Sequence, residues 1–264
     1  MAYEQLIVDL DGAVATIRMN NPARLNALSE TLTRELLQEL GRLKQDPSVR
    51  AIVLTGEGRG FSAGADLTSL QEPYLKGERP QLSNFLKEGY NKLIPLLVDS
   101  PKPIVAAING VAAGAGISLA LACDFRIASD EATFALAFIN IGLIPDAGSS
   151  FLLPRIVGMS EALRLALSGE RIDAATAVSI GLVNRSAPAD SVLAEAHGLA
   201  SKLAGLPTTA MGLTKQIFLE ASRLSLAEAM DREAEMQDDA AATDDHLECV
   251  LAFLQKRPPS FTGH

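Results

Sequence analysis

The chain of 264 residues is poor in several residue types on which protein chemistry often depends. It has no tryptophan, two cysteines and three histidines, and aromatic residues make up only 5% of it. Two cysteines provide no disulfide framework, and Cys123 lies in an apolar run that is typical of a small buried residue. No cysteines or histidines have metal-ligand spacing, and the sequence has neither a G-x-S-x-G elbow nor a P-loop. We therefore expect a protein of the reducing cytoplasm that has no metal site.

Positive charge is also scarce. The 23 lysines and arginines stand against 32 aspartates and glutamates, which gives a formal net charge of -9 and a pI near 4.9. A field of this sign does not attract phosphate backbones, so nucleic acid is not expected as a partner. A small anionic ligand would need local hydrogen-bond donors to hold it.

A membrane segment is not expected either. The N-terminus lacks the basic region and apolar stretch of a signal peptide. Residues 103–123 form an uncharged run of about membrane-spanning length. Asn109, Gly110, Gly114 and Gly116 interrupt this run, which therefore predicts a buried strand, a turn and the start of a helix.

Hydrophobic residues, by contrast, make up 48% of the chain, enough for a sizeable core in one large domain or one and a half. In the first part of the chain, short apolar runs alternate with helical spacing. This alternation predicts an α/β fold with a largely parallel sheet and covering helices. Strands are predicted at 6–9, 14–19, 51–55, 104–108 and 125–128, and helices from Ser29 to Asp46, at 84–98 and at 114–122.

After about residue 150 the sequence becomes mostly helical. We place a boundary near residue 200, which divides the chain into a core at 1–200 that carries the active site and a helical C-terminal region at 201–264. The helical patterns cover 161–167, 174–180, 191–203, 207–221 and 226–254.

Two glycine-containing segments could carry chemistry. Residues 60–67 (GFSAGADL) follow a buried strand, and their backbone N–H groups could face a ligand or simply form a turn. A dinucleotide fingerprint is excluded because the glycine spacing is off by one. Residues 109–116 (NGVAAGAG) place small residues at the start of a helix, which suits either an oxyanion or close helix packing.

A third segment, residues 141–148 (IGLIPDAG), contains a lone carboxylate in an apolar stretch. Asp146 could be the N-cap of a helix that starts near Gly148. It could also be a general acid/base whose pKa an apolar pocket raises. Composition does not separate these two interpretations.

Taken together, these segments resemble the crotonase (enoyl-CoA hydratase/isomerase) family. The similarity spans essentially the whole chain in order. It rests on residues 61–67, on 109–116 with the helix end at 119–124, on the opening 21–28 (NPARLNAL) and on the ending 253–257 (FLQKR).

The resemblance implies a crotonase-like spiral of ββα units whose helical C-terminal part forms trimers or hexamers. It implies that the backbone N–H groups of Ala65 and Ala115 hold the carbonyl oxygen of an acyl-CoA thioester, with Asp146 as the acid/base. Coenzyme A is then part of the substrate, so no separate cofactor is expected. The substrate and CoA site implied by the resemblance contains Arg24, Leu25, Ala63, Asp66, Leu67, Gly114 and Phe138, with Phe253 and Lys256 approaching from the C-terminal helix of the same or a neighbouring subunit.

Departures from the family pattern bear on the reaction. Typical hydratases carry two glutamates at the positions of Ser118 and Phe138, and they have glycine in place of Asp146. A single acid/base beside an enolate suits isomerisation, and Phe138 with Ile139 and Ile141 would keep the pocket dry. The segments around Asp146 and the tail resemble the family's isomerases of an aromatic ring epoxide. Two alternatives stay open: a hydratase of fatty-acid-type enoyl-CoA, and a CoA-binding protein of the same fold without catalysis.

Overall fold

Two sheets form the core of the protein. The computed structural model describes residues 3–264, with residues 69 and 70 described by their backbone only. Within this part of the chain, the larger sheet has six strands in the order β1-β2-β3-β5-β7-β10, and the smaller sheet has four in the order β4-β6-β8-β9. The strands are β1 Leu6–Asp11, β2 Val14–Met19, β3 Ala51–Gly56, β4 Gly60–Ser62, β5 Ile104–Ile108, β6 Val111–Ala113, β7 Phe125–Ser129, β8 Thr133–Ala135, β9 Arg171–Asp173 and β10 Arg185–Ala187.

The larger sheet is apolar on both faces. Its neighbouring strands run parallel, except in the hairpin of β1 and β2, which turns at Gly12 with a φ of 56°, as the sequence predicts. In β3, Ile52 and Leu54 belong to one hydrophobic cluster, whereas Ala51 and Val53 belong to another. This explains why the strand is a continuous apolar run, as expected for a parallel sheet covered on both faces.

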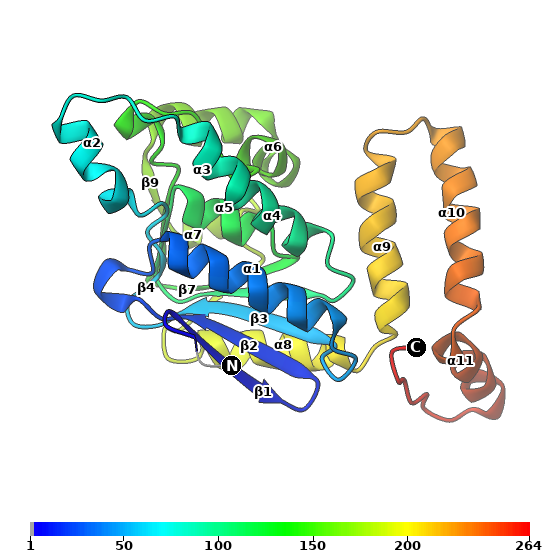
Figure 1. Cartoon of the computed structure of the whole chain (residues 1–264). Helices are drawn as coiled ribbons and strands as arrows, with labels where there is room; N and C mark the ends of the chain where they lie inside the picture. Colours follow the sequence, from blue (N-terminus) through cyan, green and yellow to red (C-terminus); the bar gives the residue numbers. More distant parts are fainter. Residues whose placement is uncertain (1–2) are drawn as a thin grey trace.

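Helices cover the two faces. The helices α1 and α4 pack on one face, and α8 packs against β2, β3, β5 and β7 on the other (Figure 1). The helices are α1 Glu30–Gln45, α2 Gln71–Leu75, α3 Leu82–Glu88, α4 Tyr90–Val98, α5 Ala115–Leu121, α6 Ser149–Ser168, α7 Ala174–Ser179, α8 Val192–Ala204, α9 Thr208–Ala221, α10 Leu226–Ala241 and α11 Asp244–Gln255, with short 3-10 helices η1 Pro22–Arg24, η2 Leu67–Leu70 and η3 Ile139–Ile141.

The chain winds through the two sheets as a spiral. Three successive turns each give one strand to the larger and one to the smaller sheet: β3 then β4, β5 then β6, β7 then β8. Helices α2 to α4 follow the first pair, α5 the second and α6 the third. The predicted α/β class is confirmed. The uncharged run at 103–123 forms β5, β6 and α5, and the described residues contain no helix that could cross a membrane.

Several predicted helices differ from the observed ones. The single helix predicted at 84–98 is two, because Gly89 ends α3 and begins α4. The single helix predicted at 226–254 is also two, and Thr243 caps the second of them, α11. The helix predicted at 161–167 is the last part of α6. The three-residue strands of the smaller sheet are not predicted at all.

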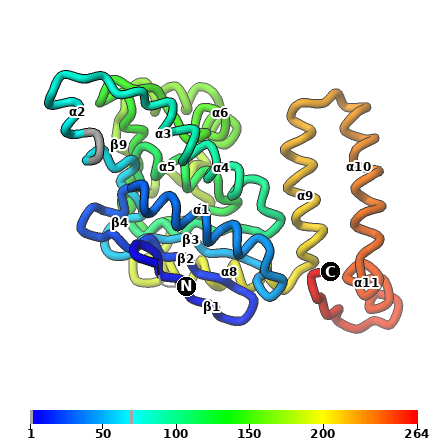
Figure 2. The backbone as a smooth tube through the Cα atoms, viewed as in Figure 1, coloured from blue at the N-terminus to red at the C-terminus, as the bar shows by residue number. Residues whose placement is uncertain are grey.

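The C-terminal helices α9 to α11 stand beside the core (Figures 1 and 2). Helix α8 crosses residue 200 and packs on the larger sheet, and α9 begins four residues after its end. Lys215 of α9 pairs with Asp124 of the core at 2.8 Å. Arg50 of the core donates to the carbonyl oxygens of Leu206 and Phe261. Large apolar side chains on these helices are exposed, among them Phe218 at 75%, Leu226 at 79% and Phe253 at 82%.

Candidate active site

The two glycine-containing segments lie side by side. Strand β4 of the first pairs in parallel with β6 of the second, and Ser62 stands opposite Ala112. A Cβ atom at Gly116 would lie 2.3 Å from the Ser62 carbonyl oxygen, and one at Gly110 would lie 2.2 Å from that of Arg59. These glycines are therefore required by backbone contact between the segments, not by a turn alone.

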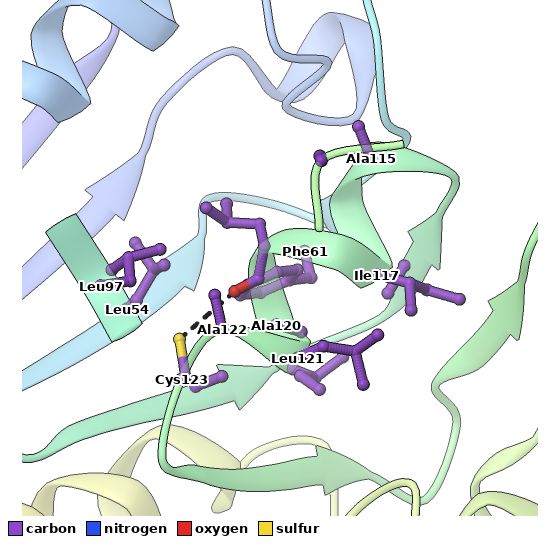
Figure 3. Packing of buried hydrophobic residues seen from close by; sticks show 14 of the residues in the cluster. Leu54, Phe61, Leu97, Ala115, Ile117, Ala120, Leu121, Ala122 and Cys123 are labelled. Carbon is purple, nitrogen blue, oxygen red and sulfur yellow. Dashed lines mark hydrogen bonds between the residues drawn. The ribbon is translucent and has the colours of Figure 1, made fainter. Parts of the chain in front are cut away.

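The start of α5 packs on the first segment. Figure 3 shows Leu54, Phe61, Ala115 and Ile117 within one buried cluster. Phe61 is completely buried, and Ala115 is 2% exposed. The N-terminus of α5 is thus held firmly against β4 by close packing.

Asn26 fastens the loop at 21–28 to the same segment. This residue is fully buried and has a φ of 55°, a left-handed conformation that asparagine tolerates better than most residues. Its Nδ2 donates to the main-chain carbonyl oxygens of Gly60 at 2.7 Å and Glu57 at 3.0 Å. The main-chain carbonyl of Asn26 accepts a hydrogen bond from the Ser62 hydroxyl. We did not predict a site role for Asn26; the available signal was a polar side chain between apolar neighbours.

The backbone N–H group of Ala65 is left free by its surroundings. Ala65 forms an isolated parallel bridge with Leu28. In this bridge the N–H of Leu28 donates to Gly64 at 2.7 Å and the N–H of Asp66 donates to Leu28 at 3.4 Å. Within the described residues, the Ala65 amide itself donates to no protein acceptor.

Ala115 offers a second free donor in the same corner. It is the first residue of α5, and the N–H of the preceding Gly114, whose φ is 49°, donates to Ala135. In the described chain no protein acceptor takes the Ala115 amide, as is usual for the first turn of a helix. A Cβ atom at Gly64 would lie only 3.2 Å from the Ala115 nitrogen, so the turns that carry the two amides touch.

Asp146 lies between η3 and α6 as a carboxylate without a partner. Its Oδ1 atom is buried and has no hydrogen-bond partner among the residues that the structure describes. Burial raises the pKa of Asp146 to about 6, because the charged form loses solvation that no donor replaces. Among the residues described, no group of three or more His, Cys, Asp or Glu side chains could hold a metal ion.

The carboxylate of Asp146 does not cap a helix. Gly148 occupies the N-cap position of α6, without a side-chain cap. The Ser149 hydroxyl and N–H donate instead to the main-chain carbonyl of Asp146, at 2.7 and 3.0 Å. Ala147 and Gly148 have φ values of 48° and 77°, so the chain after Asp146 is left-handed. A non-glycine residue held in this conformation stores strain of roughly 1–3 kcal/mol, which is common at functional sites.

The side chains at the two hydratase glutamate positions have other roles. Ser118 is fully buried, and its hydroxyl donates to the main-chain carbonyl of Asp146 at 3.1 Å, which ties α5 to this loop. Phe138 is 6% exposed and precedes η3. Ile139 and Ile141 are 44% and 56% exposed, so only Phe138 of the three predicted pocket residues is buried in a single chain.

Four of the predicted CoA-binding residues of the core form contacts in pairs. Arg24 binds the Asp66 carboxylate at 3.0 Å, and the N–H of Ala63 donates to Leu25 at 2.9 Å. Burial works to raise the pKa of Asp66, but hydrogen bonds from Thr68 and the charge of Arg24 hold it below its ordinary value. Leu67, the next residue in the chain, is 42% exposed.

Phe253 and Lys256 lie elsewhere. Phe253 is exposed on α11, and Lys256 follows that helix with a φ of 55°. Figures 1 and 2 show α11 beside the core and well apart from β4 and α5. The structure of one chain therefore does not bring these two residues to the others, and their role stays a prediction.

Comparison with known proteins decides the family. The model of the enoyl-CoA hydratase/isomerase family matches residues 9–264. The chain belongs to this family. The crotonase resemblance seen in the sequence is thereby confirmed, and the protein is an enzyme of the enoyl-CoA hydratase/isomerase class.

Relatives with different reactions are equally similar. The chain is 39% identical to the 1,2-epoxyphenylacetyl-CoA isomerase of Escherichia coli K12 over 261 residues, which cover 98% of this chain and 99% of that protein. It is also 39% identical to the 2,3-dehydroadipyl-CoA hydratase of the same strain over 263 residues, with the same coverage. An enoyl-CoA hydratase structure from Bacillus anthracis has a TM-score of 0.91 at 32% identity and covers 99% of this chain and 100% of its own. The fold is thus confirmed as crotonase-like, while overall similarity does not choose the reaction.

Proposed function

We propose that this enoyl-CoA hydratase/isomerase family member is an acyl-CoA isomerase in which Asp146 moves a proton on a thioester enolate. The observation that carries this proposal is a single buried, unpartnered carboxylate with a raised pKa. The two glutamates that typical hydratases carry are both missing, because their positions hold Ser118 and Phe138.

The oxyanion half of the mechanism uses backbone donors. The free N–H groups of Ala65 and Ala115 donate to the thioester carbonyl oxygen, which gains negative charge as a proton leaves the neighbouring carbon. Donors fixed in advance stabilise this charge without reorganisation, and each one is typically worth roughly a hundred- to a thousandfold in rate.

The proton-transfer half uses Asp146. Its carboxylate takes a proton from the carbon next to the thioester, and the electron pair of that C–H bond moves into the enolate. Asp146 then returns the proton to a more distant carbon, which shifts the double bond and regenerates the carboxylate. A pKa of about 6 suits both steps, because the group is mostly ionised at neutral pH yet basic enough to accept a proton.

The similarity to the 1,2-epoxyphenylacetyl-CoA isomerase of Escherichia coli supports an aromatic ring epoxide as the acyl group. We further propose that Arg24, Asp66 and their neighbours hold the CoA portion. Phe253 and Lys256 would complete this site from an adjacent subunit of a homotrimer or hexamer, because α11 is remote from β4 within one chain. No cofactor besides the CoA of the substrate is proposed.

The main alternative is an enoyl-CoA hydratase, which the equal identity to 2,3-dehydroadipyl-CoA hydratase supports. In that reaction Asp146 alone would position the water. Ser118 is poorly suited to hold this water, because its hydroxyl already binds the Asp146 carbonyl. A CoA-binding protein without catalysis is the third candidate, and retention of the unpartnered acid weighs against it.

Product analysis that records both the mass and the position of the double bond separates these candidates. A 3-enoyl-CoA and a 2-enoyl-CoA are each incubated with the wild type and with Asp146→Asn. A shifted double bond without added mass, lost in the variant, supports the isomerase. A gain of one water at enzyme-like rates would show a hydratase, and turnover of neither thioester, with tight binding, would favour the non-catalytic protein. The ring epoxide is the next substrate to test.

A further inference from the structure

Tyr90 is a buried phenol that the proposed mechanism does not yet use. It opens α4, is 1% exposed, and stands edge-on to the ring of Phe85 with 5.2 Å between the ring centres. Its hydroxyl is directed at the main-chain carbonyl of Leu28, 3.5 Å away. Leu28 is the bridge partner of Ala65. The hydroxyl therefore reaches the backbone that carries one of the two free amides.

Helix α4 also touches the loop that follows Asp146. A Cβ atom at Gly148 would lie 3.1 Å from Cγ2 of Ile94, which is one helical turn after Tyr90 on the same face. Burial raises the pKa of Tyr90, and the negative charges of Asp146 and Asp66 raise it further. The phenol is thus a hydrogen-bond donor at neutral pH and lies in the field of the Asp146 carboxylate.

Both polar groups are poorly satisfied. The Oδ1 atom of Asp146 is buried without a partner. Within the described part of the chain, the Tyr90 hydroxyl has only a long hydrogen bond, to a Leu28 carbonyl that already accepts from the N–H of Asp66. An unpaired buried acceptor is costly. The Asp146 carboxylate therefore lacks a donor, while the Tyr90 hydroxyl is a donor with a weak hydrogen bond.

We infer that Tyr90 is a positioning residue for Asp146: its hydroxyl donates to the Asp146 carboxylate when an acyl-CoA fills the site. This bond fixes the rotamer of the carboxylate and favours its ionised form, the form that accepts the proton. The inference rests on the proposed acid/base role of Asp146.

Other groups around the carboxylate do not compete for this role. Helices α5 and α6 contribute the hydroxyls of Ser118 and Ser149, which both bind the main-chain carbonyl of Asp146. The residues of η3 carry no charge. Asp66, the other carboxylate that faces the phenol, is held by Arg24. A titration near pH 6 that responds to the phenol therefore belongs to Asp146.

Tyr90→Phe tests the inference, because it removes the hydroxyl and keeps the ring. With a 3-enoyl-CoA, we expect kcat to fall about tenfold, with KM changed less than about twofold. The acidic limb of kcat, which reports the enzyme–substrate complex, should move up by about one pH unit. The matched control is Tyr3→Phe, which also deletes a phenol hydroxyl, one that donates to Glu39 at 2.7 Å; its acidic limb should stay in place.

A second measurement needs no turnover. The Asp146 carboxyl is titrated by 13C NMR in the acetyl-CoA complex, with its signal assigned by Asp146→Asn, and Tyr90→Phe should raise its pKa. An identical pKa and an unmoved acidic limb, in a variant that melts like the wild type, would overturn the role of Tyr90 while leaving Asp146 in place. Full activity in Asp146→Asn would instead remove the proposed function itself, and the Tyr90 inference with it.

Discussion

The two halves of the candidate site are built by opposite means. The oxyanion half consists of main chain on β4, β6 and α5, where the contact of Gly116 with the Ser62 carbonyl leaves no room for a side chain. The acid/base half is one side chain, Asp146, on a left-handed loop, and its buried oxygen has no partner. The first half is held in place by close packing and backbone hydrogen bonds and presents two free N–H groups, whereas the second carries strain and an unpaired acceptor.

This difference separates what the family shares from what decides the reaction. Polarising a thioester carbonyl serves a hydratase and an isomerase equally, since both pass through an enolate. In the proposed function, the side chains at 146, 118 and 138 decide what is then delivered, and here they are Asp, Ser and Phe. The contrast leads to four predictions, which test each half separately.

The largest effect is expected from Asp146→Asn. Loss of the only proposed acid/base should lower kcat for 3-enoyl-CoA isomerisation by about a thousandfold, within the usual range for general acid–base catalysis. Binding of acetyl-CoA, measured by calorimetry, should change little because the oxyanion half is intact. A variant that loses binding and turnover together would mean that the two halves are not separable.

Gly116→Ala disrupts the oxyanion half. The added methyl group meets the Ser62 carbonyl carbon and oxygen, so the free energy of unfolding should fall by about 3 kcal/mol, together with activity. Gly198→Ala in α8 is the control, because its Cβ position has nothing within 4 Å, and it should gain up to about 1 kcal/mol. Urea denaturation measures both, and equal stability of the two variants would contradict the rigid contact.

The pH dependence of the wild type tests whether Asp146 is the base. Asp146 must be ionised to accept a proton, so kcat/KM should fall about tenfold per pH unit below the pKa of about 6. In Asp66→Asn the limb should remain near pH 6, because the pKa of Asp66 lies below its ordinary value and this group is already ionised there. Movement of the limb to pH 4 would show that Asp146 is not the titrating base.

The smallest effect concerns stability. Because the folded state raises the pKa of Asp146 from 3.8 to about 6, it binds the proton more tightly than the unfolded chain does. This group's contribution is therefore most favourable below about pH 4 and is lost as the pH rises through 6. After allowance for partial exposure, Asp146→Asn should be about 1–2 kcal/mol more stable relative to wild type at pH 8 than at pH 4. Parallel urea titrations at the two pH values check the difference, and a constant difference would contradict the desolvation of Asp146.

The sequence predicts the long elements better than the short ones. Strands such as β3 and β5 are continuous apolar runs, because α8 and α1 bury both faces, and their bounds follow from composition. The strands of the smaller sheet have three residues each, which is too few to show the alternation of apolar and polar residues that marks a strand. Helical spacing continues through Gly89 and Thr243, and the spacing alone hides the local breaks that a glycine cap and a threonine N-cap make at these residues.

For the site, composition and spacing indicate the glycine segments but leave Asp146 between an N-cap and an acid/base, and only the family resemblance favours the acid/base. A Pro-Asp pair before a helix is the usual signature of an N-cap, and only the fold reveals that Gly148 takes that position and that the carboxylate is buried alone. Tyr90 was not found, because an aromatic residue at helical spacing with Leu93 and Leu97 indicates a core position. Its relation to the site appears only from the contact of its hydroxyl with Leu28, a residue 62 positions away along the chain.

The backbone contact at Gly116 also has a consequence for redesign. Main-chain atoms are the same whatever residues are chosen elsewhere. We therefore expect exchanges at 118, 138 and 146 to leave the backbone N–H groups of Ala65 and Ala115 in place. An engineer who wants a different product from the same thioester can therefore vary these three positions as a library and keep β4 and residues 114–116, where α5 begins, constant.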